Sequence, residues 1–195
     1  MTPITTEAPA PQRPTLPETQ EVSHHYVQST ASTHAVQPAG YADGTAAQAF
    51  LCAAMFSPPT DVAEVLAFVA DEDFEKPAQR LIVEALRALA AVGHSTDAVS
   101  VGDWLTRNGR INADTQHELT CAVTAGSNTA ALRTYAACVV AEAFREAYAS
   151  LGEALLESAG VMPEHDLMPQ LVEGGTRMRT HHRRLQGLRG HDTQN

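Results

Sequence analysis

Hydrophobic residues between Ala46 and Ala159 recur at helical spacing, and prolines and glycines divide them into successive helices. The first predicted helix ends at Ser57-Pro58-Pro59, and the second begins with Thr60 as its N-cap. A third helix is predicted to carry Pro77 in its first turn and to end at Gly93. The pattern therefore predicts a series of short helices at the start of this region.

Two further helices complete a predicted globule over residues 45–126. Ser100 and Asp103 have the spacing of a capping box, and the helix that they introduce ends at Gly109. The next helix is predicted over residues 113–125. No stretch alternates between polar and apolar residues clearly enough to require a strand, so the predicted fold is all-α.

The pattern changes over residues 128–187, where two long helices are predicted. An apolar stripe continues for about thirty residues, which is longer than a small globule needs. Gly160 and Pro163 predict a turn, and a second helix follows over about residues 164–185. The prediction is a long antiparallel helical hairpin whose apolar seam forms a dimer or partner interface. The predicted interface residues are Tyr135, Val139, Phe144, Leu151, Leu155, Leu167 and Leu171.

The two ends of the chain differ from this helical region. Residues 1–44 are rich in Thr, Pro, Ser and Gln and contain few large apolar side chains. Because ordering such a segment costs entropy without burial, a disordered N-terminal arm is predicted. Residues 188–195 are predicted to be a flexible tail. The arm and the polar ending 191–195 favour natural termini over a fragment.

Charge is distributed unevenly along the chain. Thirteen basic and 23 acidic residues give a net charge of -10, which argues against general coating of nucleic acid. Arginines are nevertheless concentrated near the C-terminus, and they form a candidate nucleic-acid contact. These arginines are Arg177, Arg179, Arg183, Arg184 and Arg189. The alternative is a helix end whose cations complement the helix dipole, and no aromatic residues accompany the arginines to stack on bases.

No enzyme site is predicted. A P-loop requires the pattern GxxxxGK[ST], whereas the single lysine, Lys76, precedes Pro77. The acidic run Asp71–Asp73 precedes a helix, where its charge complements the dipole. The histidines lack the spacing of metal ligands, so neither a metal nor another cofactor is expected.

The cellular setting is predicted from similar observations. Cys52, Cys121 and Cys138 stand alone in apolar helical stretches and are predicted to be buried, reduced thiols. No signal peptide and no apolar run of about 20 residues is present, so no membrane contact is predicted. A cytoplasmic protein is expected.

Four segments carry a resemblance to a known family: Ala47–Ala54, Asp73–Ile82, Asp97–Leu105 and Ser127–Ala136. In this order they are similar to the motifs EQAVLGAL, DFYRPAHRLI, VDxVTVxxxL and SAANIRxYA of the N-terminal domain of the DnaB-family replicative DNA helicases. The family's Glu, Tyr, His and Asn are replaced here by Ala47, Glu75, Gln79 and Ala131. The family's GGxxYL turn is replaced by Ile111–Asp114.

The resemblance implies a function. In the family, this domain is a helical globule with a hairpin that pairs into dimers, and three dimers form the helicase collar that receives primase and, in some systems, loaders. The expectation is therefore a non-enzymatic replication protein without the ATPase motor. It would form a dimer or a hexameric ring and bind primase, helicase or loader. The alternatives are an accessory protein that binds nucleic acid through its arginines and a fragment of a full ATP-dependent helicase.

Overall fold

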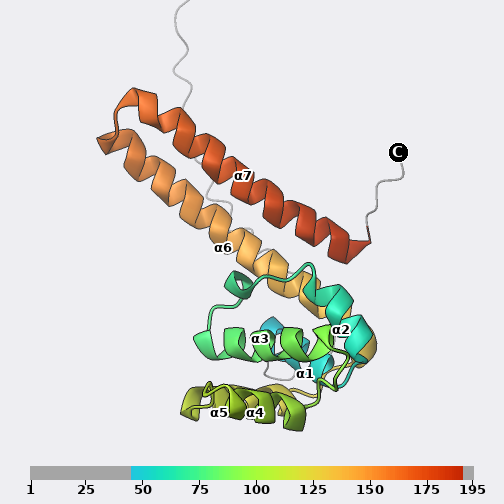
Figure 1. Cartoon of the computed structure of the whole chain (residues 1–195). Coiled ribbons are helices and arrows are strands. Elements are labelled where there is room, and N and C mark those ends of the chain that lie inside the picture. The colour runs from blue at the N-terminus through green and yellow to red at the C-terminus, as the bar shows by residue number, and fades with distance from the viewer. Residues whose placement is uncertain (1–44, 191–195) are drawn as a thin grey trace, which may run out of the picture. The chain divides into compact units, whose positions relative to one another are not determined.

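The computed structural model describes residues 45–190, and all regular structure in this range is helical (Figure 1). The predicted arm and residues 191–195 lie outside the described residues. The elements are α1 (Ala46–Met55), α2 (Pro59–Leu66), the 3-10 turn η1 (Asp71–Asp73), α3 (Pro77–Ala91), α4 (Ala98–Arg107), α5 (Ala113–Thr124), the 3-10 turn η2 (Thr129–Ala131), α6 (Leu132–Val161) and α7 (Glu164–Arg189). The prediction of an all-α fold with a long hairpin is confirmed.

Helix α1 forms the centre of the core. Phe50 and Leu51 are fully buried, and α1 packs against α3, α5 and α6. The aromatic ring of Phe50 lies 5.9 Å from that of Phe74, which follows η1. The other core positions of α1 are mostly alanine, and side chains this small allow neighbouring helices to approach on several sides.

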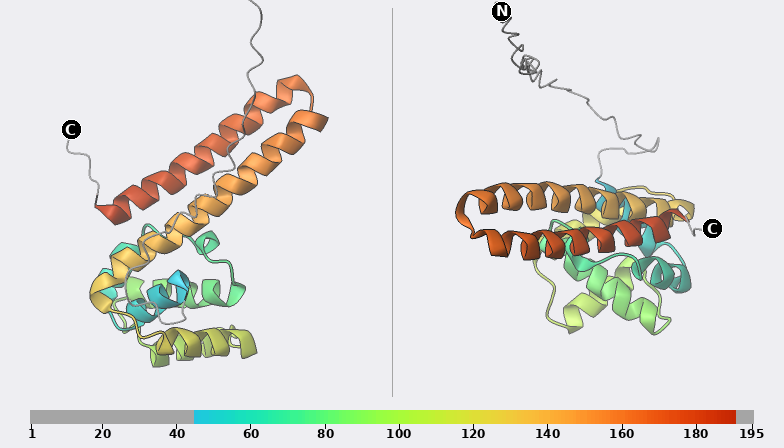
Figure 2. Two further views of the ribbon diagram at one scale, coloured as in Figure 1. Left: turned by 180° about the vertical axis from the view of Figure 1, so that it is seen from behind. Right: turned by 90° about the horizontal axis from the view of Figure 1, so that it is seen from above.

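Helix α6 belongs to both the core and the hairpin. Its first three turns contribute Leu132, Ala136 and Val140 to the same buried cluster as α1. Beyond these turns, α6 leaves the globule and runs beside α7 (Figures 1 and 2). The helices predicted over 45–126 therefore lack a complete core without α6.

Two predicted helix starts are wrong in detail. Helix α2 begins at Pro59 rather than after Thr60, because proline at the first helical position already has helical φ. The N-cap of α4 is Asp97 rather than Ser100, since an Asp97 carboxylate oxygen accepts a 2.9 Å hydrogen bond from the Ser100 amide. This cap lowers the pKa of Asp97 to about 2, through hydrogen bonds from the Ser95 hydroxyl and the Ser100 amide.

The hairpin is longer than its sequence signals indicated. Helix α6 continues through Gly160 to Val161, and only Pro163 starts the next helix. Helix α7 continues to Arg189 and ends at Gly190, whose φ is 69°. Leu188 is 2% exposed. The flexible tail predicted over residues 188–195 is therefore wrong at its start, because Leu188 and Arg189 belong to α7.

A buried carboxylate connects three helices of the globule. Glu118 on α5 accepts hydrogen bonds from Lys76, immediately before α3, and from Gln79 on α3, the latter at 3.0 Å. Burial alone would raise the pKa of Glu118, but the bonds from Lys76, Gln79 and Gln48 outweigh it and hold the pKa below its usual value. The single lysine of the chain therefore has a structural partner.

A second buried carboxylate fixes the hairpin to the globule. Asp73 of η1 has a fully buried side chain. Its carboxylate accepts hydrogen bonds from both terminal nitrogens of Arg184 on α7, with Nη2 2.9 Å from Oδ1. Asp73 also accepts a 2.8 Å hydrogen bond from the Ala70 amide, and His181 lies 3.8 Å away. This bidentate pair joins residues 111 positions apart, and we call it the clasp.

The end of α7 makes another close contact with the globule. Gly187 lies against the ring of Phe68, so closely that a Cβ atom at this position would overlap the ring. Arg133 donates a 3.0 Å hydrogen bond to the Gly187 carbonyl, pairs with Glu64, and stacks 5.8 Å above the Phe68 ring. Glycine at this position therefore allows α7 to approach the globule.

We predict that Glu118→Gln reduces the free energy of unfolding by about 1–3 kcal/mol at neutral pH, because Lys76 loses its buried counter-ion. Since the folded-state pKa of Glu118 is depressed, its contribution is present above the unfolded pKa and lost as the pH falls through the folded value. Urea unfolding at neutral and acidic pH should show the difference from wild type shrinking below about pH 4. The exposed Glu157→Gln is the control, and a pH-independent difference would contradict the prediction.

We also predict that Asp73→Asn costs about 3 kcal/mol, because it leaves the Arg184 guanidinium buried without its counter-ion. Asparagine retains an oxygen for the Ala70 amide, so the loss reports mainly on the ion pair. Asp71→Asn is the matched control, since Asp71 pairs with Arg87 at the surface and should cost below about 1 kcal/mol. Equal losses in chemical unfolding would show that the clasp is no stronger than a surface pair.

Candidate interaction surface of the hairpin

The seam between α6 and α7 has a defined register. Gly174 packs directly against Leu151, because a Cβ atom at residue 174 would overlap the leucine side chain. Nearer the globule, the ring of Phe144 lies 6.3 Å from that of His181 and 6.5 Å from that of His182. The two contacts are seven residues apart on each helix, as expected for antiparallel neighbours.

Most of the predicted interface residues lie within this chain's own packing. Val139 is 2% exposed and belongs to the core. Tyr135 also packs against the core, and its hydroxyl accepts a 3.5 Å hydrogen bond from the Asn128 amide. Phe144, Leu151, Leu155 and Leu167 are only partly exposed. Leu171 is the member of the predicted set with a largely open side chain, at 45% exposure.

The distal half of the hairpin presents other apolar side chains, which the sequence reasoning missed. They are Tyr148, Leu156 and Val161 on α6, and Met168 and Val172 beside Leu171 on α7. Leu156 is 80% exposed and Met168 is 62% exposed. A signal was available for Leu156, which comes five residues after Leu151 and therefore lies on the far side of α6 from the seam. The hairpin thus has exposed apolar surface in addition to its internal seam.

The five C-terminal arginines separate into two groups. Arg184 is held in the clasp and is only 15% exposed, so its charge is already compensated. The other four are exposed: Arg177, Arg179, Arg183 and Arg189. None of these four lies within 4.0 Å of a carboxylate in the described part of the chain, although Arg179 donates to the Thr176 hydroxyl.

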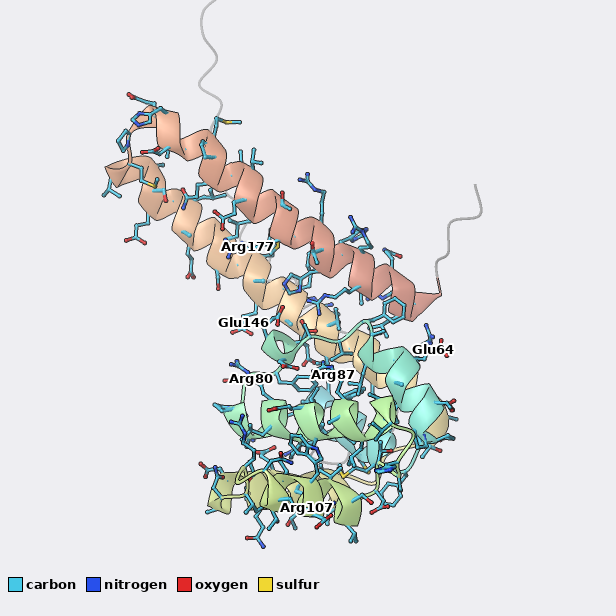
Figure 3. All side chains as sticks on the ribbon, in the orientation of Figure 1. Glu64, Arg80, Arg87, Arg107, Glu146 and Arg177 are labelled. Carbon is cyan, nitrogen blue, oxygen red and sulfur yellow. The ribbon has the colours of Figure 1, made fainter. Side chains whose placement is uncertain are left out.

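A groove of about 590 Å³ lies where the hairpin meets η1. Its walls include the small or apolar residues Ala147, Leu151, Ala154 and Gly174, and Arg177 lies on α7 beside them (Figure 3). His181 and Arg184, which contact Asp73, form the end nearest the globule. The groove is therefore bounded by the clasp and by one side of the seam.

Residues 45–190 contain few side chains arranged for metal binding or thiol chemistry. No group of three or more His, Cys, Asp or Glu side chains is placed to hold a metal ion in this range. Cys52, Cys121 and Cys138 are free thiols, of which Cys52 is buried and the other two are partly exposed. This corrects the prediction that all three are buried. Among the described helices, none is both long and apolar enough to cross a membrane.

Comparisons with known proteins agree with this architecture. The crystal structure of the N-terminal domain of DnaB helicase from Mycobacterium tuberculosis is similar, with a TM-score of 0.58 and 22% sequence identity over 69% of this chain and 94% of that chain. At this identity, the likeness shows a shared helical fold. A comparison with curated proteins found no match. The family model of the DnaB-like helicase N-terminal domain matches residues 42–141, just over half of the 195 residues, and this chain therefore belongs to that family.

Proposed function

We propose that this chain is a replication-associated interaction protein, which forms dimers through its hairpin and binds a primase, a replicative helicase or a helicase loader. The family membership supports a role connected with the replicative helicase. The observation that carries the proposal is the exposed apolar surface of the distal hairpin. Binding rather than chemistry would be its task, since the sequence contains no P-loop and its single lysine is paired with Glu118.

The dimer would use the exposed residues of the distal half rather than the internal seam. Leu156 and Met168 lie on neighbouring helices close to the turn and project large apolar groups into solvent. Leu171 and Val172 extend this surface along α7. Contiguous apolar surface of this kind is usually covered by another protein surface, most often in a twofold dimer.

Leu156→Asp and Met168→Asp should each weaken dimerisation at least about tenfold, because a carboxylate is costly to bury in an apolar contact. Both side chains are exposed in the single chain, so the helical content and thermal stability should remain close to wild type. Sedimentation velocity across a concentration series measures the dimer fraction.

Val99→Asp is the matched control, because Val99 is 81% exposed but lies on α4 of the globule. The control should dimerise like wild type. A wild-type chain that stays monomeric throughout the micromolar range would contradict the proposed dimer, as would equal losses in all three variants.

The partner prediction is that a purified primase, helicase or loader from the same host binds this chain at least about tenfold more tightly than DNA does. The test is biolayer interferometry with each candidate protein and with single- and double-stranded DNA. If none of the three proteins binds while DNA does, the interaction role in replication is refuted.

The exposed arginines favour nucleic-acid binding as the second candidate function. Arg177, Arg179 and Arg183 have no carboxylate partner in the described structure, so they are available to phosphates. Such binding should weaken with salt, with a slope of log K against log salt of about -0.9 per phosphate contacted on duplex DNA. Replacing all three by Gln should remove DNA binding and leave binding to a replication protein unchanged.

A further inference from the structure

The hairpin carries two rows of charged residues of opposite sign, one along the outer edge of each helix. Most arginines of the globule have a partner: Arg87 pairs with Asp71, Arg107 with Asp103, Arg110 with Glu84 and Arg133 with Glu64. The corresponding charges on the outer edges of the hairpin have no ion pair within 4.0 Å in residues 45–190. This difference separates the hairpin edges from the rest of the described surface.

The acidic row lies on the outer edge of α6. Its members are Glu142, Glu146, Glu153 and Glu157, and all four are exposed. Partial burial raises the pKa of Glu142, and the nearby Arg145 offsets part of this effect, so the row is predominantly rather than purely acidic. The spacing of four, seven and four residues keeps them on one side of a helix. Leu151 faces α7, and Glu142 lies nine residues before it, which is half a turn away from the seam. Glu146 is visible on the side of α6 away from α7 (Figure 3).

The basic row lies on the outer edge of α7, on the opposite side of the hairpin. Arg179 and Arg183 are four residues apart and exposed. Arg183 is nine residues beyond Gly174, which faces α6, so it too points half a turn away from the seam. The two rows cannot neutralise each other within one chain, because both helices lie between them.

The register of the seam places the two rows at the same height. Moving two residues from the Phe144–His181 contact in either direction brings Glu146 level with Arg179 and Glu142 level with Arg183. Towards the tip, the same register brings Glu153 level with Val172. The matched charges are therefore confined to the half of the hairpin nearer the globule.

We propose that the acidic edge of α6 binds the basic edge of α7 of a second copy of this chain, with Glu142 and Glu146 of one copy facing Arg183 and Arg179 of the other. A twofold pairing of like edges would place carboxylate against carboxylate or guanidinium against guanidinium, which is repulsive. Only unlike edges attract, and a contact between unlike edges is heterologous. Such a contact leaves one free edge of each kind, so it repeats and produces assemblies larger than a dimer.

This edge contact is distinct from the apolar contact of the proposed function. It uses exposed charges, and salt screens the attraction between such charges. The screening length is about 10 Å at 0.1 M ionic strength, so the edge contact should weaken as salt is added. The apolar contact contains Leu156 and Met168 and is largely insensitive to salt. Low salt should therefore add larger species to those present at high salt.

The test is a charge-swap experiment on the full chain. The variant Glu142→Lys/Glu146→Lys has two basic edges, and the variant Arg179→Glu/Arg183→Glu has two acidic edges. Each variant alone should lose the larger species at low salt, as measured by sedimentation velocity. An equimolar mixture should recover them, because the new basic edge of the first variant meets the new acidic edge of the second, and the two unchanged edges attract as before.

The controls separate this proposal from its rivals. Leu156→Asp should remove the salt-insensitive dimer while the larger low-salt species still form from edge contacts, so failure of the proposed function and failure of the edge contact are distinguishable. Glu153→Lys/Glu157→Lys reverses two charges near the tip and should reduce the larger species less than Glu142→Lys/Glu146→Lys.

Several outcomes would overturn the edge contact. These are an absence of larger species at low salt in wild type, a mixture that behaves as the sum of its parts, or equal effects of the tip and base reversals. Low-salt species that contain nucleic acid by absorbance ratio, and disappear after nuclease treatment, would show that Arg179 and Arg183 bind phosphate instead.

Discussion

The ion pair between Asp73 and Arg184 determines how the two parts of this fold are held together. The carboxylate lies in a short 3-10 turn and is fully removed from solvent. A buried carboxylate is very unfavourable without a partner, and the pair itself contributes little net stability once desolvation is counted. Its main consequence is therefore geometric. The Asp73 carboxylate meets Arg184 only when α7 returns to the globule with one position along its axis and one orientation about it.

The hairpin is consequently anchored through both of its helices. Helix α6 begins in the core with Leu132, and α7 ends against it with Leu185 and Leu188. The Gly187 contact with Phe68 leaves no room for a side chain at this point, which further restricts the position of α7. Between the anchored end and the turn, each of the two helices packs mainly against the other among the elements of residues 45–190. Apolar residues on the remaining sides of the distal half therefore stay in solvent.

The sequence predicted the helices well because their signals are local. Pro77 and Gly93 begin and end α3 as expected, and the long stripe after residue 127 is a helix of 30 residues. Side-chain roles were harder to predict, because they depend on distant partners. Arg184 resembled its neighbours in the basic segment, since its counter-ion is 111 residues away. Val139 fitted the hairpin stripe, yet at its height α6 is still inside the globule.

The hairpin combines two kinds of surface because one end is anchored in the globule and the other end is not. Near the globule, packing takes up the inner sides of both helices, so charges such as Glu146 and Arg179 remain on the outer edges. Near the turn, no third element of the described chain covers the hairpin, and apolar side chains such as Leu156 stay exposed. An apolar surface can pair with its own copy, because it carries no charge that opposes itself. Charged edges of opposite sign cannot pair in that way, and they favour a neighbour related by a different operation. The anchoring of one hairpin thus leaves two surfaces for the two proposed contacts, of which one would depend on burial and the other on ionic strength.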